Sequence, residues 1–286
     1  MPFTLSHAAA VLPAMRTDGT GRGRLVPAVL LAGSFAPDTT YYAASALPAA
    51  MGFGDVTHSF PGVLTVDVLI AWALVGAWLV LREPLVALLP RNRQGRVGAL
   101  VRCGAPRAPI RPSAALWWYV SAVLGALTHV VWDAFTHLDR WGMRIFPVLG
   151  REIAGSPLYW YLQYGGSAVA AVVIAAFVVV ALRRQHAAGP VGVPVLSRRD
   201  RWLAAALLGG CAAVAAVQRA VHWWEYWGAR AKPWELIPTV CFGAGAGLAV
   251  GLAVYAVAVR LRRPAPPAPA PAPAMPHAEP SRPSAR

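Results

Sequence analysis

Five apolar segments, each long enough to cross a lipid bilayer as a helix, set the strongest limit on how this chain can fold. They cover about residues 62–81, 114–135, 160–182, 202–222 and 236–259. A spanning helix needs about 20 apolar residues, because the hydrocarbon core is about 30 Å thick. The third segment is the clearest, with no charged residue from Ala168 to Leu182. We therefore expect an all-α fold, a polytopic membrane helical bundle of about five spanning helices.

The composition agrees with a membrane protein and argues against a nucleic-acid partner. Charged residues make up 13% of the chain, about half of their share in ordinary soluble domains. The net charge of +14 could indicate nucleic-acid binding, but arginines in loops that set membrane topology explain it more simply. The three cysteines form no CxxC pair, so no thiolate zinc site is expected. We expect a membrane lipid as partner and no nucleic acid.

The distribution of basic residues predicts the orientation of the chain. If there are five spans, segments 82–112 and 183–201 and the tail from Arg260 share one side, and together they hold 17 arginines. The other side, formed by residues 1–61, 136–159 and 219–235, holds nine basic residues. Loops rich in Lys and Arg stay in the cytoplasm. We therefore expect a multi-pass protein of the cell membrane with a cytoplasmic C-terminus.

The two ends of the chain differ from the central bundle, residues 62–260. In the N-terminal segment 1–61, residues 25–36 are apolar but too short to cross, and Pro37 and Asp38 end the run. A buried or re-entrant half-helix fits such a piece, and we expect this segment to contribute to the functional site. Residues 261–286 are rich in Pro and Ala, which is typical of an extended, disordered tail.

A stripe of ionisable residues marks the end of the second apolar segment. His129, Asp133 and His137 are spaced four residues apart, so in a helix they lie on one face. An ionisable group in the hydrocarbon region costs several kcal/mol unless it is paired or coordinated. An imidazole and a carboxylate one turn apart offer two ligands to a divalent ion such as zinc. A His–Asp hydrogen bond that joins two helices is the alternative explanation.

Other ionisable side chains are expected near the same depth in the membrane. They are Asp67, His222 and Glu225 in or beside the spans, and His7, Asp38 and His58 in the N-terminal segment. Each has an ordinary explanation alone: Asp67, for example, could pair with Arg144. Together they indicate one polar site. The chain contains no Gly-x-Ser-x-Gly elbow, P-loop or HExxH motif, which argues against serine hydrolases, nucleotide-driven pumps and zincin proteases.

Four short stretches resemble a known family. They are MPFTLSHAAAVLP at the start, GSFAPD at 33–38, THSFPG at 57–62 and GALTHVVWDAFTHLDRWG at 125–142. They look like the bacterial integral-membrane family called domain of unknown function 4184. Their order is also similar to the LexA-regulated, inner-membrane, metal-dependent hydrolase group. The resemblance implies a metal site built from His7, Asp38, His58, His129 and Asp133, with His137 near. The chain has PDTT where the broader group carries a second Asp, which speaks against a two-metal site.

Two functions fit these observations. The first is a membrane-embedded metallohydrolase, in which zinc is held by His7, Asp38, His58, His129 and Asp133. His137 or a leftover carboxylate would be the base. A site near the outer boundary suits a lipid or envelope-related substrate. The second is a non-enzymatic membrane protein, such as a transporter or a metal-binding or assembly factor, that uses the same cluster.

Overall fold

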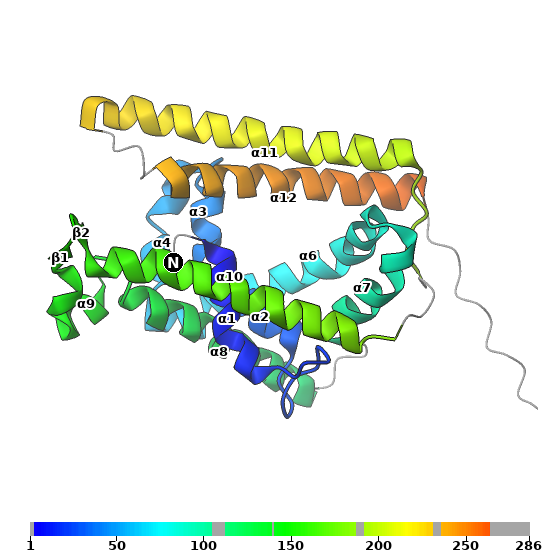
Figure 1. The fold of residues 1–286 in the computed structure, drawn as a ribbon, viewed down its shortest axis with the longest axis horizontal. Helices are drawn as coiled ribbons and strands as arrows, with labels where there is room; N and C mark the ends of the chain where they lie inside the picture. The colour runs from blue at the N-terminus through cyan, green and yellow to red at the C-terminus, as the bar shows by residue number, and fades with distance from the viewer. Residues whose placement is uncertain (1–2, 105–111, 139, 187–191, 231–235, 264–286) are drawn as a thin grey trace, which may run out of the picture.

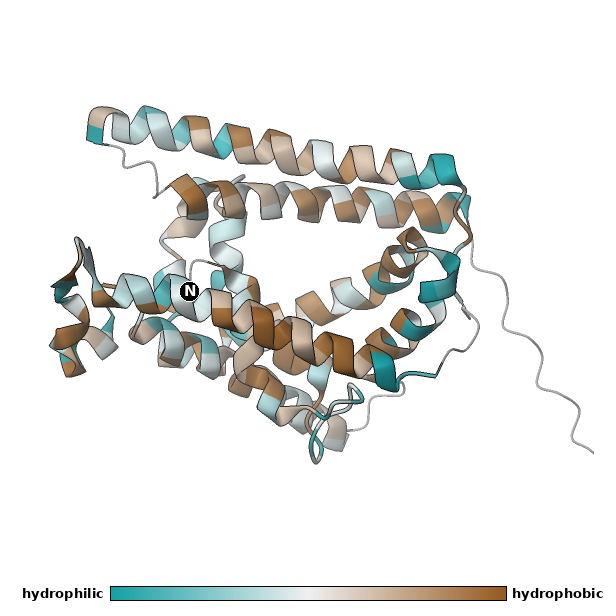
Figure 2. Ribbon diagram, viewed as in Figure 1, coloured by the Kyte–Doolittle hydropathy of each residue, from teal (hydrophilic) through white to brown (hydrophobic). Residues whose placement is uncertain are grey.

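Five long helices dominate the structure, a computed structural model that describes residues 3–104, 112–138, 140–186, 192–230 and 236–263. Within these residues, five helices are long and apolar enough to cross a membrane, which confirms the predicted all-α bundle. They are α6 (Val66–Leu88), α8 (Pro112–Ala134), α10 (Leu158–Arg184), α11 (Arg198–Trp227) and α12 (Leu236–Arg262) (Figure 1). Figure 2 shows apolar residues along these helices and polar residues near the ends of α10 and α11. Residues 264–286 of the predicted tail lie outside the described part.

Short elements fill the remaining described chain. The short α-helices are α1 (Ala8–Val11), α2 (Pro27–Phe35), α3 (Thr39–Ala43), α4 (Gly54–Thr57), α5 (Phe60–Leu64), α7 (Arg91–Cys103) and α9 (Trp141–Ile145). Turns of 3-10 helix cover Thr4–His7, Leu12–Ala14, Ala36–Asp38, Pro48–Met51, Pro147–Gly150 and Gly228–Arg230. Strands β1 (Glu152–Ile153) and β2 (Ser156–Pro157) form a small antiparallel hairpin before α10.

The first span lies further along the chain than the hydropathy predicts. The apolar run begins near residue 62, but the backbone leaves helical geometry at Thr65, with φ −129° and ψ −81°, so that α5 is separate from α6. At the other end α6 continues past the charged pair Arg82 and Glu83 to Leu88. The Arg82 Nε lies 2.7 Å from the Glu83 carboxylate. This pairing lowers the cost of carrying both charges in the last turns of the helix.

An arginine of α12 supplies the hydrogen-bond donor that a proline removes from α6. Pro84 has no N–H, so the carbonyl oxygen of Val80 has no intrahelical donor. The Arg260 guanidinium donates to this oxygen, with Nη2 at 2.6 Å. The buried Tyr255 hydroxyl donates to the Pro84 carbonyl oxygen at 2.7 Å. These two bonds fasten α12 to α6, whereas α11 packs mainly against α12.

The apolar piece at 25–36 forms the predicted half-helix. Helix α2 packs against α6 and α8, and its Val29 and Leu30 side chains are fully buried. Gly125 of α8 permits this approach, because a Cβ there would overlap the carbonyl oxygen of Leu30. Gly33 of α2 is equally tight against the Ala122 carbonyl. Small residues at a helix interface let two backbones come close.

The N-terminal segment does not lie wholly at the outer end, which corrects one expectation. Gln185 Nε2, just after α10, donates to the Asp18 carbonyl oxygen at 2.8 Å, and Ala28 N donates to Gly104 O after α7 at 3.0 Å. The loop with Arg16, Arg22 and Arg24 therefore shares the end of the bundle that carries α7. Placing three more arginines there strengthens the charge asymmetry between the two ends.

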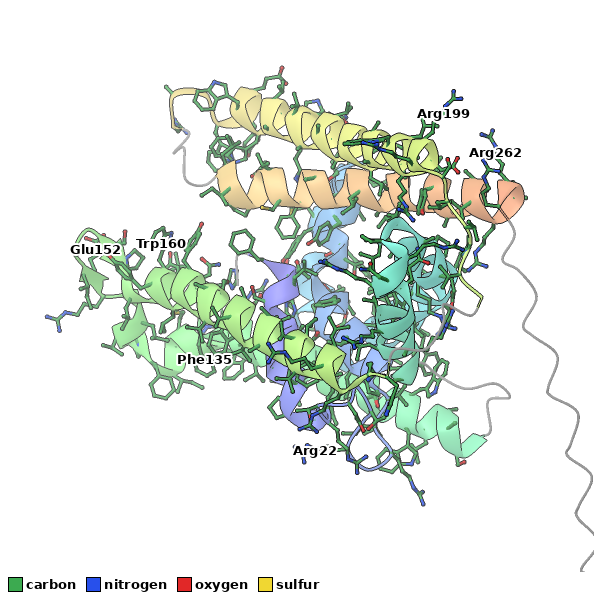
Figure 3. The ribbon with its side chains drawn as sticks, turned by 45° about the vertical axis from the view of Figure 1, so that its right-hand side comes forward. Arg22, Phe135, Glu152, Trp160, Arg199 and Arg262 are labelled. Atoms are coloured by element: carbon green, nitrogen blue, oxygen red, sulfur yellow. The ribbon has the colours of Figure 1, made fainter. Side chains whose placement is uncertain are left out.

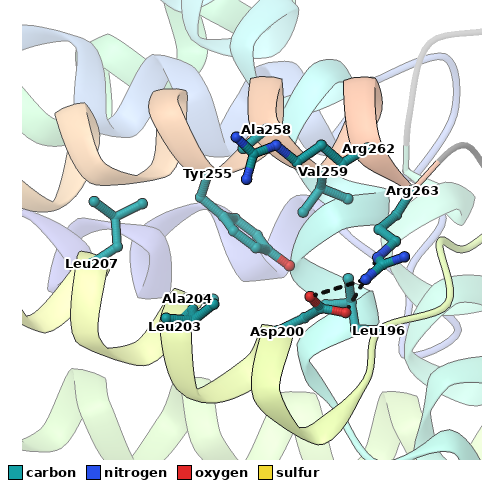
Figure 4. A pocket seen from close by; sticks show the side chains of 10 residues that line it. All are labelled: Leu196, Asp200, Leu203, Ala204, Leu207, Tyr255, Ala258, Val259, Arg262 and Arg263. Carbon is teal, nitrogen blue, oxygen red and sulfur yellow. Dashed lines mark hydrogen bonds and ion pairs between the residues drawn. The ribbon is translucent and has the colours of Figure 1, made fainter.

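We call the end of the bundle that carries α7 and the loop with Arg16, Arg22 and Arg24 the arginine-rich end. Figure 3 shows Arg199 and Arg262 together there, far from Glu152 and Trp160 at the opposite end. A hollow of about 220 Å³ lies between α11 and α12 at the arginine-rich end, and Figure 4 shows the side chains that line it. Beside this hollow, Arg263 Nε lies 3.3 Å from the Asp200 carboxylate, and this ion pair connects the end of α12 to the start of α11. This hollow is separate from the site described next.

Candidate metal centre

Four buried side chains from three parts of the chain meet at one point. They are Asp38 at the end of a 3-10 turn, His58 just after α4, and His129 and Asp133 in the last turns of α8. One ligand atom from each lies within 4.8 Å of the other three, so the group could hold a metal ion. The site sits near the first turn of α6 and the last turns of α8, away from the arginine-rich end.

The separations within this group fit a shared ion better than hydrogen bonds. His129 Nε2 lies 3.4 Å from Asp38 Oδ1 and 3.4 Å from Asp133 Oδ2. His58 Nε2 lies 3.6 Å and 3.7 Å from the same two oxygens. An N–H···O bond spans about 2.7–3.2 Å, whereas ligand atoms about 2.1 Å from a tetrahedral ion lie about 3.4 Å apart. The distance from each imidazole nitrogen to the two carboxylates is therefore close to the distance between ligand atoms that share one metal ion.

The backbone orients both imidazoles. His129 Nδ1 lies 2.8 Å from the carbonyl oxygen of Ser34 in α2, and His58 Nδ1 lies 2.9 Å from that of Gly54. A carbonyl oxygen only accepts, so we assign the proton to each Nδ1. In the neutral rings each Nε2 lone pair would then face the carboxylates, and the buried His129 Nε2 has no hydrogen-bond partner within the described structure. Metal-binding histidines are oriented in this way in proteins.

The carboxylate of Asp38 is kept ionised. Burial alone would raise the pKa of Asp38, but the charge of His129 and the contacts from His129 and His58 hold it below its usual range. Thr4 Oγ1 also donates to Asp38 Oδ2 at 2.5 Å. Burial would lower the pKa of His58, but the Asp133 and Asp38 carboxylates together raise it. Without an ion, therefore, His58 keeps its Nε2 proton to a higher pH than a free imidazole does, and an ion would have to displace that proton.

His7 lies beside this group and outside it. Its ring stacks on that of His129, with centroids 3.5 Å apart, and its Nε2 lies 3.4 Å from Asp133 Oδ1, the oxygen that the other histidines do not face. Burial and the neighbouring His129 lower the pKa of His7, so the imidazole is neutral near pH 7. The role of His7 as a ligand stays a prediction. In the structure its Nε2 contacts Asp133 Oδ1, on the side of the carboxylate away from the other histidines.

A hollow of about 270 Å³ opens onto three of the four clustered residues. It is lined by Asp38, Tyr41, His58, Asp133, His137, Arg140, Gln163, Tyr164, Pro238 and Phe242. His137 Nδ1 lies 3.6 Å from Asp133 Oδ2, and its Nε2 lies 3.0 Å from the Gln163 amide nitrogen. Burial lowers the pKa of His137, although Asp133 opposes the shift. The predicted base therefore stands beside the cluster, at the wall of a space that a small ligand could enter.

The other candidate residues do not join the cluster. Asp67 is fully buried near the start of α6, and neither carboxylate oxygen has a hydrogen-bond partner in the described structure. A pairing of Asp67 with Arg144, one ordinary explanation for this carboxylate, is absent from the ion pairs of the described residues, and Arg144 is exposed on α9. His222 and Glu225 are exposed on α11. That helix packs mainly against α12, which leaves both residues apart from the cluster.

Sequence reasoning missed three residues that line the hollow: Tyr41, Arg140 and Gln163. Tyr41 and Gln163 carry no charge and belong to no motif, so nothing in the sequence singled them out. Arg140 was counted only as a loop arginine. The stretch LDRWG places it three residues after His137, and this adjacency was the available signal.

Comparison with known proteins gives one match. A family model described as "Domain of unknown function (DUF4184)" matches residues 1–257. The match includes all four clustered residues together with His7, His137 and the lining of the hollow. No curated protein and no solved structure matches the chain.

Proposed function

The chain belongs to the family of domain of unknown function 4184, and we propose that it is a membrane-embedded, metal-dependent hydrolase that acts on a lipid or envelope-related substrate. The observation that carries this proposal is the arrangement of two imidazoles and two carboxylates 3.4–3.7 Å apart. A buried group of this kind is costly unless an ion compensates the two carboxylates. The hollow beside it supplies room for water and a substrate group.

Zinc is the ion that we propose. Two imidazole nitrogens and two carboxylate oxygens suit zinc, which accepts both donor types at about 2.0–2.2 Å. A bound zinc would lower the pKa of a water molecule toward about 7 and polarise a carbonyl or phosphoryl group. Three of the four proposed ligands line the hollow, so the accessible side of the ion would face it.

His137 is the proposed general base. The lowered pKa keeps this imidazole neutral near pH 7, so it can accept a proton from water in the hollow. The Gln163 amide, 3.0 Å from its Nε2, holds the ring in place. Because this amide nitrogen is a donor, it occupies the Nε2 lone pair, and Nδ1 would carry the proton of the neutral ring. The amide would have to turn away from Nε2 before that atom could accept a proton from water.

The position of the cluster in the bundle suggests which substrate reaches it and on which side of the membrane it opens. The cluster lies in the last turns of α8, near one membrane boundary and away from the arginine-rich end. Basic loops stay in the cytoplasm, so the site would open at the outer face of the cell membrane and the C-terminus would be cytoplasmic. A lipid or an envelope precursor is the substrate class that reaches such a site from within the membrane.

One observation favours the second function, a non-enzymatic metal-binding role. Four protein ligands complete a tetrahedral shell, which is typical of structural zinc, whereas catalytic sites keep three protein ligands and a water. If all four side chains bind the ion, catalysis requires a fifth coordination position, open to the hollow, for water. The two functions therefore differ in whether a substrate turns over while the ion is bound.

Turnover and metal content measured on the same samples separate these functions. The full chain, purified in detergent and loaded with zinc, is incubated with a membrane lipid extract, and products are followed by mass spectrometry. We expect hydrolysis that a chelator abolishes and zinc restores, and that His137→Gln reduces about 100-fold with zinc content unchanged. His222→Gln, an exposed histidine outside the site, is the control. Bound zinc without hydrolysis of any lipid would favour the metal-binding role.

A further inference from the structure

An arginine lines the same hollow as the candidate metal centre. Arg140 lines the same space as Asp38, His58 and Asp133. Its Nη2 lies 3.5 Å from the Tyr41 hydroxyl, and the Tyr41 ring centroid is 5.4 Å from that of His58. One tyrosine side chain therefore separates the guanidinium from a candidate ligand of the ion.

Within the described residues, no carboxylate forms an ion pair with Arg140, although Asp38 and Asp133 line the same hollow. A divalent ion would balance those two carboxylates and leave the guanidinium as the uncompensated charge of the described lining. A partly enclosed site with a net positive charge attracts an anion, and the low dielectric strengthens this attraction.

The polar lining fits a phosphoryl group. The guanidinium presents N–H donors in a planar fork that matches two phosphate oxygens. The Tyr41 hydroxyl and the Gln163 amide add donors from two other elements. A tetrahedral phosphoryl group has enough oxygens to meet the guanidinium and an ion at the same time, which a neutral ester carbonyl does not.

The rest of the lining is apolar and comes from two candidate spans. Tyr164 belongs to α10, and Pro238 and Phe242 belong to α12. A volume of about 270 Å³ is at the lower limit for small-molecule sites, so it suits a headgroup and not a lipid tail. A tail attached to that headgroup would leave between α10 and α12 along their apolar surfaces.

We infer that the substrate is a phosphate ester of a lipid alcohol and that Arg140 binds its phosphoryl oxygens. This inference rests on the proposed hydrolase function. In the reaction, the water oxygen forms a bond to phosphorus, and the bond between phosphorus and the lipid oxygen breaks. One water proton passes to His137 and then to the departing lipid oxygen. Ester and water thus give a lipid alcohol and phosphate, with no change of oxidation state.

Binding measured without turnover tests the role of Arg140. The zinc-loaded full chain in detergent is titrated, by calorimetry, with the methylene phosphonate analogue of dihexanoyl phosphatidic acid, whose P–C bond does not hydrolyse. We expect Arg140→Gln to weaken binding at least about tenfold, since it removes the charge-assisted hydrogen bonds to the phosphoryl oxygens. Zinc content should be unchanged. Arg144→Gln is the matched control, because Arg144 is exposed on α9 and does not line the hollow.

Each other outcome has a definite meaning. Equal affinity of wild type and Arg140→Gln, with zinc bound to both, overturns the inference and leaves the hydrolase proposal standing. Absence of zinc from the wild type overturns the hydrolase proposal itself. Inorganic phosphate that binds as tightly as the phosphonate lipid overturns the lipid assignment in favour of a water-soluble ester. Hexanoate that binds more tightly than the phosphonate overturns the phosphate assignment.

Discussion

The Nδ1 atom of His129 lies 2.8 Å from the carbonyl oxygen of Ser34, although the two residues are 95 positions apart. This contact joins the half-helix α2 to the span α8 and turns the free nitrogen of His129 toward Asp38 and Asp133. The orientation of the imidazole therefore depends on how closely the two helices pack.

Gly125→Val tests this dependence. A side chain at Gly125 would overlap the Leu30 carbonyl, so α2 must move away from α8. Overpacking of this kind costs about 1–3 kcal/mol, and the shift would withdraw Ser34 from His129. We expect a lower melting temperature and at least a tenfold weaker zinc affinity. Gly76→Val, in α6 where a Cβ meets nothing within 4 Å, should change neither quantity. Unaltered zinc affinity in Gly125→Val would show that the Ser34 contact is dispensable.

The helical spans were predictable from the sequence because length and hydropathy alone decide them. The stripe of His129 and Asp133 was predictable for a similar reason, since it follows from the helical repeat. The contact with Ser34 was not predictable, because it depends on tertiary packing through Gly33 and Gly125. The same holds for the loop at Asp18: no local signal indicates that it folds back to Gln185 at the arginine-rich end.

The stability of the metal-free protein should depend on pH through His58. The pKa of His58 is raised above its usual 6.5 by Asp133 and Asp38. Its contribution to the free energy of unfolding is therefore complete below about pH 6.5 and is lost as the pH rises through the folded-state pKa. The lowered pKa values of His7 and His137 act in the opposite direction and below pH 6.5. We expect the melting temperature of the chelated wild type to fall above pH 6.5.

Two comparisons check the assignment to His58. In His58→Gln the fall in melting temperature above pH 6.5 should be smaller than in the wild type. With zinc present the trend should reverse, because zinc binding displaces the proton and strengthens as the pH rises. Identical pH profiles of the chelated wild type and His58→Gln would refute the assignment.

The contact between α12 and α6 can be measured as a coupling between Arg260 and Pro84. Arg260 donates to the Val80 carbonyl that Pro84 leaves without a helical donor. We expect Arg260→Gln to lower stability by about 1 kcal/mol. In a Pro84→Ala background, where residue 84 can donate to Val80, the same change should cost clearly less. Equal costs in both backgrounds, from thermal unfolding in detergent, would contradict the role assigned to Arg260.

The zinc content of the purified full chain tests the central claim most directly. Loaded with zinc, dialysed and analysed by mass spectrometry, the wild type should retain about one ion per chain. His129→Ala and Asp133→Ala should lose it, because each removes a ligand from the group of four, whereas His222→Ala should retain it. Low zinc in the wild type that neither site substitution changes would contradict the claim that these imidazoles and carboxylates gather around an ion.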